Sequence, residues 1–152
     1  MTARRSLWLV AALALAPAPA FAQDMCAALN RIAEAAAEPE PFASLRDGTS
    51  LVPGYDYCRV ETGTAARAGG VFCHRQLAPR SLIAETVGAQ VRDCLGAVPG
   101  RILDRFPPAA LTYRTDRLSI SVTSHCDERC HVGRLASIEI RRLRGDETPP
   151  PP

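Results

Sequence analysis

Six cysteines are the feature that most restricts what this chain can fold into. They are Cys26, Cys58, Cys73, Cys94, Cys126 and Cys130. All of them follow an N-terminal stretch that carries the marks of a secretory signal. An even set of cysteines in an exported chain is typical of a disulfide framework. We therefore expect a small domain that is stapled by disulfides in an oxidising compartment.

The signal has three parts: Arg4 and Arg5, an apolar run over 7–16, and small residues at 20–22. A membrane span needs about 20 apolar residues, and Pro17 interrupts this run well before that. We expect cleavage after Ala22, which leaves a soluble, periplasmic or secreted protein without a membrane span. The segment 4–8 also fits a twin-arginine signal, so the general secretory route and the twin-arginine route both stay open.

The charge balance of the mature part argues against two classes of partner. All 18 basic residues are arginine, and removal of Arg4 and Arg5 leaves 16 against 16 acidic residues. A net charge near zero predicts neither a nucleic-acid partner nor an anionic membrane surface. The length of 23–144 suits a single domain. The segment 145–152 ends in four prolines and is expected to be a disordered or polyproline tail.

Hydrophobic periodicity predicts an α+β fold. One helix is expected from Asp24 to about Glu38, with an apolar stripe that includes Leu29 and Ile32. A second helix, from Ser81 to Leu95, carries apolar residues three and four apart. Strands are expected over 55–61, 70–77, 109–115, 118–126 and 130–143. The order α-β-β-α-β-β-β favours a largely antiparallel sheet of about five strands with the helices on one face.

The last two strands alternate clearly between apolar and polar residues. Leu118, Ile120, Val122 and Cys126 share one face, whereas Ser119, Ser121, Thr123 and His125 share the other. On the returning strand Cys130, Val132, Ala136, Ile138 and Ile140 have one parity. If 127–129 form a three-residue loop, Cys126 lies opposite Cys130 and His125 lies opposite His131.

These placements lead to a predicted disulfide set. The second helix should cover the first hairpin, which brings Cys94 over Cys73. Facing positions in the last hairpin put Cys126 within disulfide reach of Cys130. By elimination Cys26 pairs with Cys58.

Two histidines give a metal hypothesis. His125 and His131, with a carboxylate from Asp127 or Glu128, form a set that zinc or copper(II) accepts. The alternative is that both histidines are solvated beside a structural disulfide. Three residues separate Cys126 from Cys130, whereas zinc knuckles favour two, and His74 is expected to be an ordinary strand residue.

The sequence predicts a binding protein rather than an enzyme. No serine has the G-x-S-x-G context, and the glycines at 69 and 70 lack the lysine of a phosphate loop. No cofactor is expected. We expect a non-catalytic binding or inhibitor-like module that presents Ser119, Ser121, Thr123 and Arg117, or the loop after Gly96, to a protein or cell-envelope partner. The alternative is a periplasmic metal-binding protein that uses His125 and His131.

One loose resemblance points in the same direction. An aromatic residue beside a strand cysteine, here Phe72-Cys73, precedes a helix that ends in Cys94-Leu95. This arrangement resembles small exported proteins of proteobacteria over about residues 26–95. The resemblance implies a shared staple and fold, and no activity.

Overall fold

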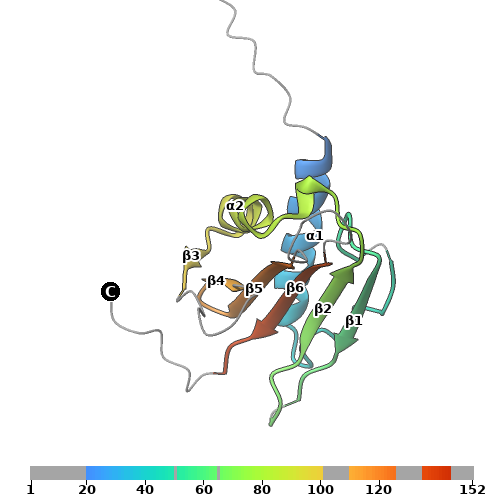
Figure 1. Cartoon of the computed structure of the whole chain (residues 1–152). Helices are drawn as coiled ribbons and strands as arrows, with labels where there is room; N and C mark the ends of the chain where they lie inside the picture. The colour runs from blue at the N-terminus through green and yellow to red at the C-terminus, as the bar shows by residue number, and fades with distance from the viewer. Residues whose placement is uncertain (1–19, 50, 65, 101–109, 126–134, 145–152) are drawn as a thin grey trace, which may run out of the picture.

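The structure is a computed structural model that describes residues 20–49, 51–64, 66–100, 110–125 and 135–144 (Figure 1). It contains helices α1 (Ala20–Ala36) and α2 (Ala84–Leu95), a 3₁₀ turn η1 (Arg80–Leu82), and strands β1 (Tyr57–Glu61), β2 (Gly70–Arg75), β3 (Val98–Pro99), β4 (Ala110–Arg114), β5 (Leu118–His125) and β6 (Leu135–Arg142). Of the predicted signal peptide, 1–22, residues 1–19 lie outside these ranges, and Ala20–Ala22 belong to α1. The proline tail, 145–152, also lies outside them. Within them, neither helix is long and apolar enough to cross a membrane.

The strands form one antiparallel sheet in the order β1-β2-β6-β5-β4-β3. The α+β class is therefore confirmed, with six strands in place of about five. The additional strand β3 pairs Val98 with Arg114 and Pro99 with Tyr113, in a stretch expected to be a connection. Strand β6 lies between β2 and β5, so the last strand of the chain joins the first hairpin to the second.

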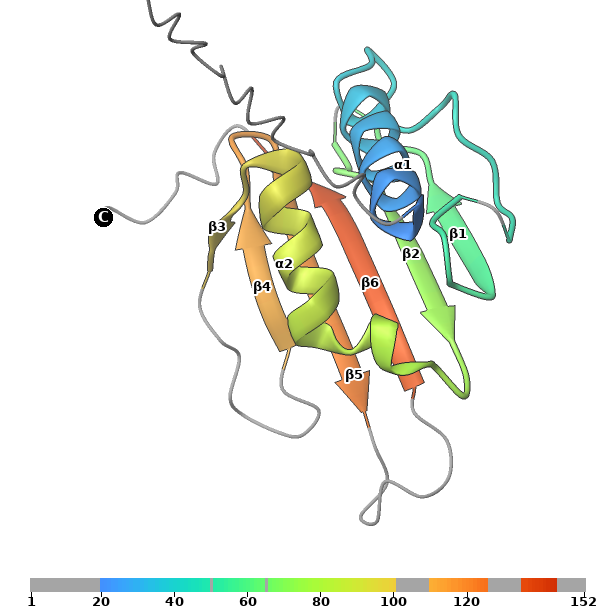
Figure 2. The ribbon, with the colours of Figure 1, turned by 90° about the horizontal axis from the view of Figure 1, so that it is seen from above.

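Both helices lie on the same face of the sheet (Figure 2). The strand residues beneath them form transverse rows of apolar side chains, such as Val122, Ile138, Cys73 and Cys58 in register. All four of these side chains are buried. The predicted alternation is confirmed, since Leu118, Ile120 and Val122 lie in this core together with Ala136, Ile138 and Ile140. We call the opposite side, which neither described helix covers, the open face.

The second helix begins three residues later than predicted. Arg80, Ser81 and Leu82 form the 3₁₀ turn, and α2 starts at Ala84 after Ile83, which supplies no capping side chain. Instead the Ala84 N–H donates to Oγ of Ser124 on β5, at 3.0 Å. A first-turn N–H has no partner within its own helix. Here a strand hydroxyl supplies that partner, which periodicity cannot reveal.

The register of the last hairpin differs from the expected one. His125 pairs with Leu135 and Leu118 pairs with Arg142. The expected pairing of His125 with His131 is therefore wrong, and the connection is longer than three residues. The shift is by four residues, an even number, so each side chain keeps its predicted face. Cys126 and Cys130 lie outside the described residues. Their disulfide stays a prediction, but the strand register from which it was inferred is wrong.

The other predicted disulfides are wrong. The structure joins Cys26 to Cys94, with the Cα atoms 5.0 Å apart, and Cys58 to Cys73, with the Cα atoms 4.0 Å apart. The predicted pairs Cys73–Cys94 and Cys26–Cys58 fail because α2 packs on β4 and β5 rather than on the first hairpin. The two disulfides show that the domain is stapled and indicate an oxidising compartment.

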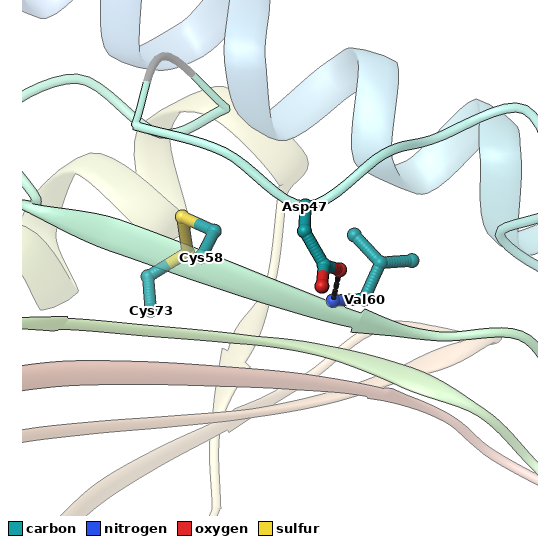
Figure 3. The surroundings of a disulfide bond; sticks show 4 residues. All are labelled: Asp47, Cys58, Val60 and Cys73. Carbon is teal, nitrogen blue, oxygen red and sulfur yellow. Dashed lines mark hydrogen bonds between the residues drawn. A yellow bond between two sulfur atoms is a disulfide. The ribbon is translucent and has the colours of Figure 1, made fainter.

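Cys58 and Cys73 face each other across β1 and β2 at a position that suits a cross-strand disulfide (Figure 3). The backbone N–H and C=O of Cys58 bond outward to Gly48, at 2.8 and 3.0 Å. Cys58 and Cys73 therefore form the close, non-hydrogen-bonded type of pair. Asp47 accepts a hydrogen bond from the Val60 N–H at 2.7 Å. Together these bonds cover part of the outer edge of β1, which would otherwise be open to pairing with another strand.

Replacement of Gly88 by alanine should destabilise the protein by about 2 kcal/mol, although alanine favours helix. A Cβ atom at Gly88 would lie 2.0 Å from Oη of Tyr113 and 2.6 Å from its Cζ. Tyr113 is itself buried on β4 beneath α2, so it has little room to move. Urea unfolding measures the loss. In a Tyr113→Ala background the same change should be neutral or stabilising, and an equal loss there would contradict the steric explanation.

Tyr55→Phe should leave stability at neutral pH unchanged or slightly raised. The Tyr55 hydroxyl is buried and has no hydrogen-bond partner among the described residues. Burial also raises the pKa of the Tyr55 phenol above its usual value. Above about pH 10 the unfolded chain loses this proton and the folded chain keeps it, so stability falls as pH rises. Between pH 8 and pH 11 the free energy of unfolding should fall less for Tyr55→Phe than for the wild type, as unfolding curves at the two pH values can show. An equal fall in both proteins would contradict the prediction.

Candidate functional site

The predicted hydroxyl stripe lies where it was expected. Ser119, Ser121 and Thr123 follow the open face of β5, and each is half-buried. Their neighbours across the sheet include Thr112 on β4 and Ser137 on β6. Arg117 does not join them: it lies in the turn between β4 and β5 and contributes to a groove on the helix side. The loop after Gly96 is described only as far as Gly100.

The metal hypothesis is only partly covered by the structure. His125 is exposed at the end of β5, whereas His131, Asp127 and Glu128 lie outside the described residues. Among the residues that are described, no group of three or more His, Cys, Asp or Glu could hold a metal ion. His74 points to the open face, and its ring lies 6.1 Å from that of Tyr57.

Joint replacement of His125 and His131 by alanine should change the free energy of unfolding by no more than about 0.5 kcal/mol, as is usual for surface side chains. His125 is exposed and has no charged partner among the described residues. Chemical unfolding and the metal content of the purified protein check this prediction. A loss of several kcal/mol, or copurified metal that the double variant lacks, would contradict it.

An aromatic and arginine cluster on the open face was missed in the sequence. Phe72 on β2 is half-buried between two guanidinium groups. The Cζ atom of Arg59 lies 5.3 Å from its ring centroid, and that of Arg141 lies 5.0 Å away. Such contacts are favourable cation–π pairs. We call Phe72, Arg59 and Arg141 the Phe72 cluster.

Gly70 explains how Arg141 reaches the ring. In the β2–β6 register Arg141 faces Gly70, not Phe72. A Cβ atom at Gly70 would lie 3.3 Å from Cγ of Arg141 and 3.3 Å from Cε2 of Phe72. Because glycine leaves this space empty, the arginine stem can lean across the strand. The alternation places all three cluster residues on the open face, but only the β2–β6 pairing brings them together.

The cluster belongs to a surface with an excess of positive charge. Glu61 forms ion pairs with Arg59 at 2.8 Å and with Arg67 at 3.8 Å. Glu139 pairs with Arg141 on the same strand. Arg114, which is on the same face of β4, has no acidic partner among the described residues. Asp47 lies beside this face as well, where its carboxylate accepts a hydrogen bond from the Tyr57 hydroxyl at 3.1 Å. Among the described residues these four arginines therefore meet three carboxylates, each of which already has a partner.

A groove opens on the helix side, between α1, the end of α2 and the β4–β5 turn. Its volume is about 620 Å³, and its lining consists of Asn30, Ala33, Glu34, Ala37, Cys94, Leu95, Thr115, Asp116, Arg117 and Leu118. The turn is ordered by Oγ1 of Thr115, which accepts hydrogen bonds from the backbone N–H groups of Arg117 and Leu118 at 3.2 and 3.0 Å. The turn therefore forms an ordered wall of the groove, and the lining combines apolar side chains with the charged residues Glu34, Asp116 and Arg117.

Comparison with known proteins adds no further assignment. No protein-family model, curated protein or solved structure matches the chain significantly. The candidate sites consequently depend on the residues and the geometry of this chain alone.

Proposed function

We propose that this protein is a non-catalytic binding module whose open face docks an acidic segment of a protein partner. The Phe72 cluster carries the proposal. Aromatic and arginine side chains are the types most often found at the energetic centres of protein interfaces. A ring held between two guanidinium groups is already ordered, so it loses little conformational freedom on binding. The surrounding serine and threonine hydroxyls provide the hydrogen-bonding rim that such interfaces have.

Charge supports an acidic partner. Each guanidinium group has five N–H donors, and the ion pairs with Glu61 and Glu139 use only some of them. The donors that remain, together with Arg114, can bind carboxylates in the forked geometry that arginine favours. The arginines at 59, 67 and 141 are well exposed, so this attraction should weaken as salt concentration rises.

The proposed place of action is the periplasm or the extracellular space, after cleavage behind Ala22. The two disulfides support an oxidising compartment. Cleavage there would remove Ala20–Ala22 from α1 and would keep the buried Met25 and the disulfide-bonded Cys26. The intact mass of the exported product tests this: it should begin at Gln23, and a product that retains Trp8 would refute it.

The docking face can be tested by site-specific photo-crosslinking in envelope extract. A photoreactive residue at Ser121, on the open face, should capture a partner through an acidic segment. The same residue at Glu85, exposed on α2, is the control and should not capture it. Arg59→Gln with Arg141→Gln should reduce the Ser121 adduct at least tenfold. The matched pair Arg31→Gln with Arg92→Gln, on exposed helix positions, should leave the adduct unchanged.

Each other outcome argues against the proposal. Equal crosslinking from Ser121 and Glu85 would mean that capture is unspecific. An adduct that survives in the Arg59/Arg141 variant would mean that the Phe72 cluster is not the docking centre. Unfolding curves of both double variants exclude loss of the fold as the cause.

A further inference from the structure

The two described disulfides differ in how open they are to a dissolved thiol. Cys58 is 0% exposed and Cys73 is 2% exposed, beneath the helices. Cys26 and Cys94 are both only partly buried. Cys94 also belongs to the lining of the 620 Å³ groove, whereas Cys26 does not. A thiolate can therefore approach the Cys26–Cys94 bond from the groove, on the side of Cys94.

We propose that Cys94 is a thiol–disulfide exchange site that a small cationic thiol reaches through this groove. The attacking thiolate forms a bond to Sγ of Cys94 while the Cys26–Cys94 bond breaks, and Cys26 leaves as a thiolate. A second thiol then attacks the reagent sulfur of the mixed disulfide and releases Cys94. Two reagent thiols are oxidised to one disulfide, the protein disulfide gains the two electrons, and the protons released by the reagent are taken up by the two cysteines.

The positions of the two cysteines favour this direction of attack. Cys94 lies in the last turn of α2, at the negative end of the helix dipole. Cys26 lies near the start of α1, and after cleavage behind Ala22 it would lie in the first helical turn. The free N–H groups of a first turn stabilise a thiolate. Cys26 is therefore the better leaving group, and Cys94 is the sulfur that should carry the adduct.

The rim of the groove favours a positively charged reagent. Glu34 has no ion-pair partner among the described residues, and Asp116 contacts Arg117 at 3.5 Å. The C-terminal ends of both helices contribute Ala37 and Leu95 to the lining, and these ends are partially negative. Arg117 is the only basic residue of the lining and stands against two carboxylates, and Arg92, in the last turn of α2, lies outside the lining. The resulting field should repel an anionic thiol and attract one that carries an ammonium group.

Three reagents of different charge test the site on the full-length mature protein: cysteamine, 2-mercaptoethanol and 3-mercaptopropionate. Each is applied at limiting concentration, and the reaction is stopped with acid at intervals. Every cysteine lies on a separate tryptic peptide, because an arginine separates each neighbouring pair along the chain. Peptide mapping therefore reports each bond and each adduct separately. Rates are compared per thiolate, at low and at high salt.

We expect Cys26–Cys94 to react at least tenfold faster than Cys58–Cys73, with the adduct on Cys94. Cysteamine should react fastest, 2-mercaptoethanol more slowly and 3-mercaptopropionate slowest. High salt should reduce the differences among these three rates. Glu34→Gln should reduce the difference between the rates of the cationic and the anionic thiol, and Arg117→Gln should increase that difference. Glu85→Gln, an exposed acid at the other end of α2, is the matched control and should leave it unchanged.

Several results would overturn the proposal. Equal rates for the two disulfides would show that reduction follows global unfolding. An adduct on Cys26 would place the attack on the wrong sulfur. If Glu34→Gln leaves the rate differences among the three thiols unchanged, the thiols do not approach through the groove. Because the open face takes no part in this reaction, the result is independent of the proposed docking function.

Discussion

Replacement of Cys26 and Cys94 together by alanine should lower the free energy of unfolding by about 4 kcal/mol. The two cysteines are 68 residues apart in the sequence, and a crosslink that closes a long loop restricts the unfolded chain most. Cys58 and Cys73 are only 15 residues apart. The corresponding double replacement should therefore cost less, about 3 kcal/mol by the same chain-entropy relation. Urea unfolding of the two variants and the wild type gives both values.

The order of the two losses is the decisive part of this prediction. Cys58 and Cys73 are the more deeply buried pair, so an explanation that depends on packing alone would make their replacement the more harmful one. A larger loss for Cys58/Cys73 would contradict the chain-entropy explanation. The single variants Cys26→Ala and Cys58→Ala are not suitable controls, because each leaves a free thiol that can form new pairs.

Phe42→Ala should destabilise the protein by about 4 kcal/mol, within the usual range for a buried phenylalanine. Phe42 is 0% exposed and is one of the largest fully buried side chains in the described core. It follows the end of α1, and its N–H donates to the carbonyl of Ala35 at 2.8 Å. The backbone at this position has a φ of 65°, which is about as unfavourable for alanine as for phenylalanine because both carry a Cβ atom. The loss therefore reports the cavity left by the ring.

Phe72→Ala is the matched control, because it removes the same ring from the open face. Phe72 is half-buried and packs against two arginine side chains rather than against the core. Its replacement should cost no more than about 1 kcal/mol. Comparable losses for Phe42→Ala and Phe72→Ala in urea unfolding would mean that the two faces of the sheet are not energetically distinct.

Local patterns were sufficient for the two helices and for five of the six strands; they missed the short strand β3. The stripe on the first helix predicted the burial of Leu29 and Ile32, and both are buried in α1. The alternation in β5 and β6 predicted which side chains enter the core. These predictions hold because helix and strand periods are properties of a short segment and need no knowledge of its neighbours.

The disulfides and the candidate sites needed information that no short segment carries. The insertion of β6 between β2 and β5 decides that α2 packs on β4 and β5, so Cys94 meets Cys26 and lies away from Cys73. The same insertion brings Arg141 onto Phe72. Neither contact has a sequence signal, because pairing between distant strands depends on the fit of whole faces.

The sequence by itself determined the two helices, five of the six strands, their order and the buried side of the last two strands, because these follow from hydrophobic periodicity along the chain. Only the tertiary structure decided strand order, disulfide partners, the Phe72 cluster and the groove beside Cys94. The physical reason is that many strand pairings bury the same apolar residues. The pairing that is adopted is selected by the packing of all the elements together.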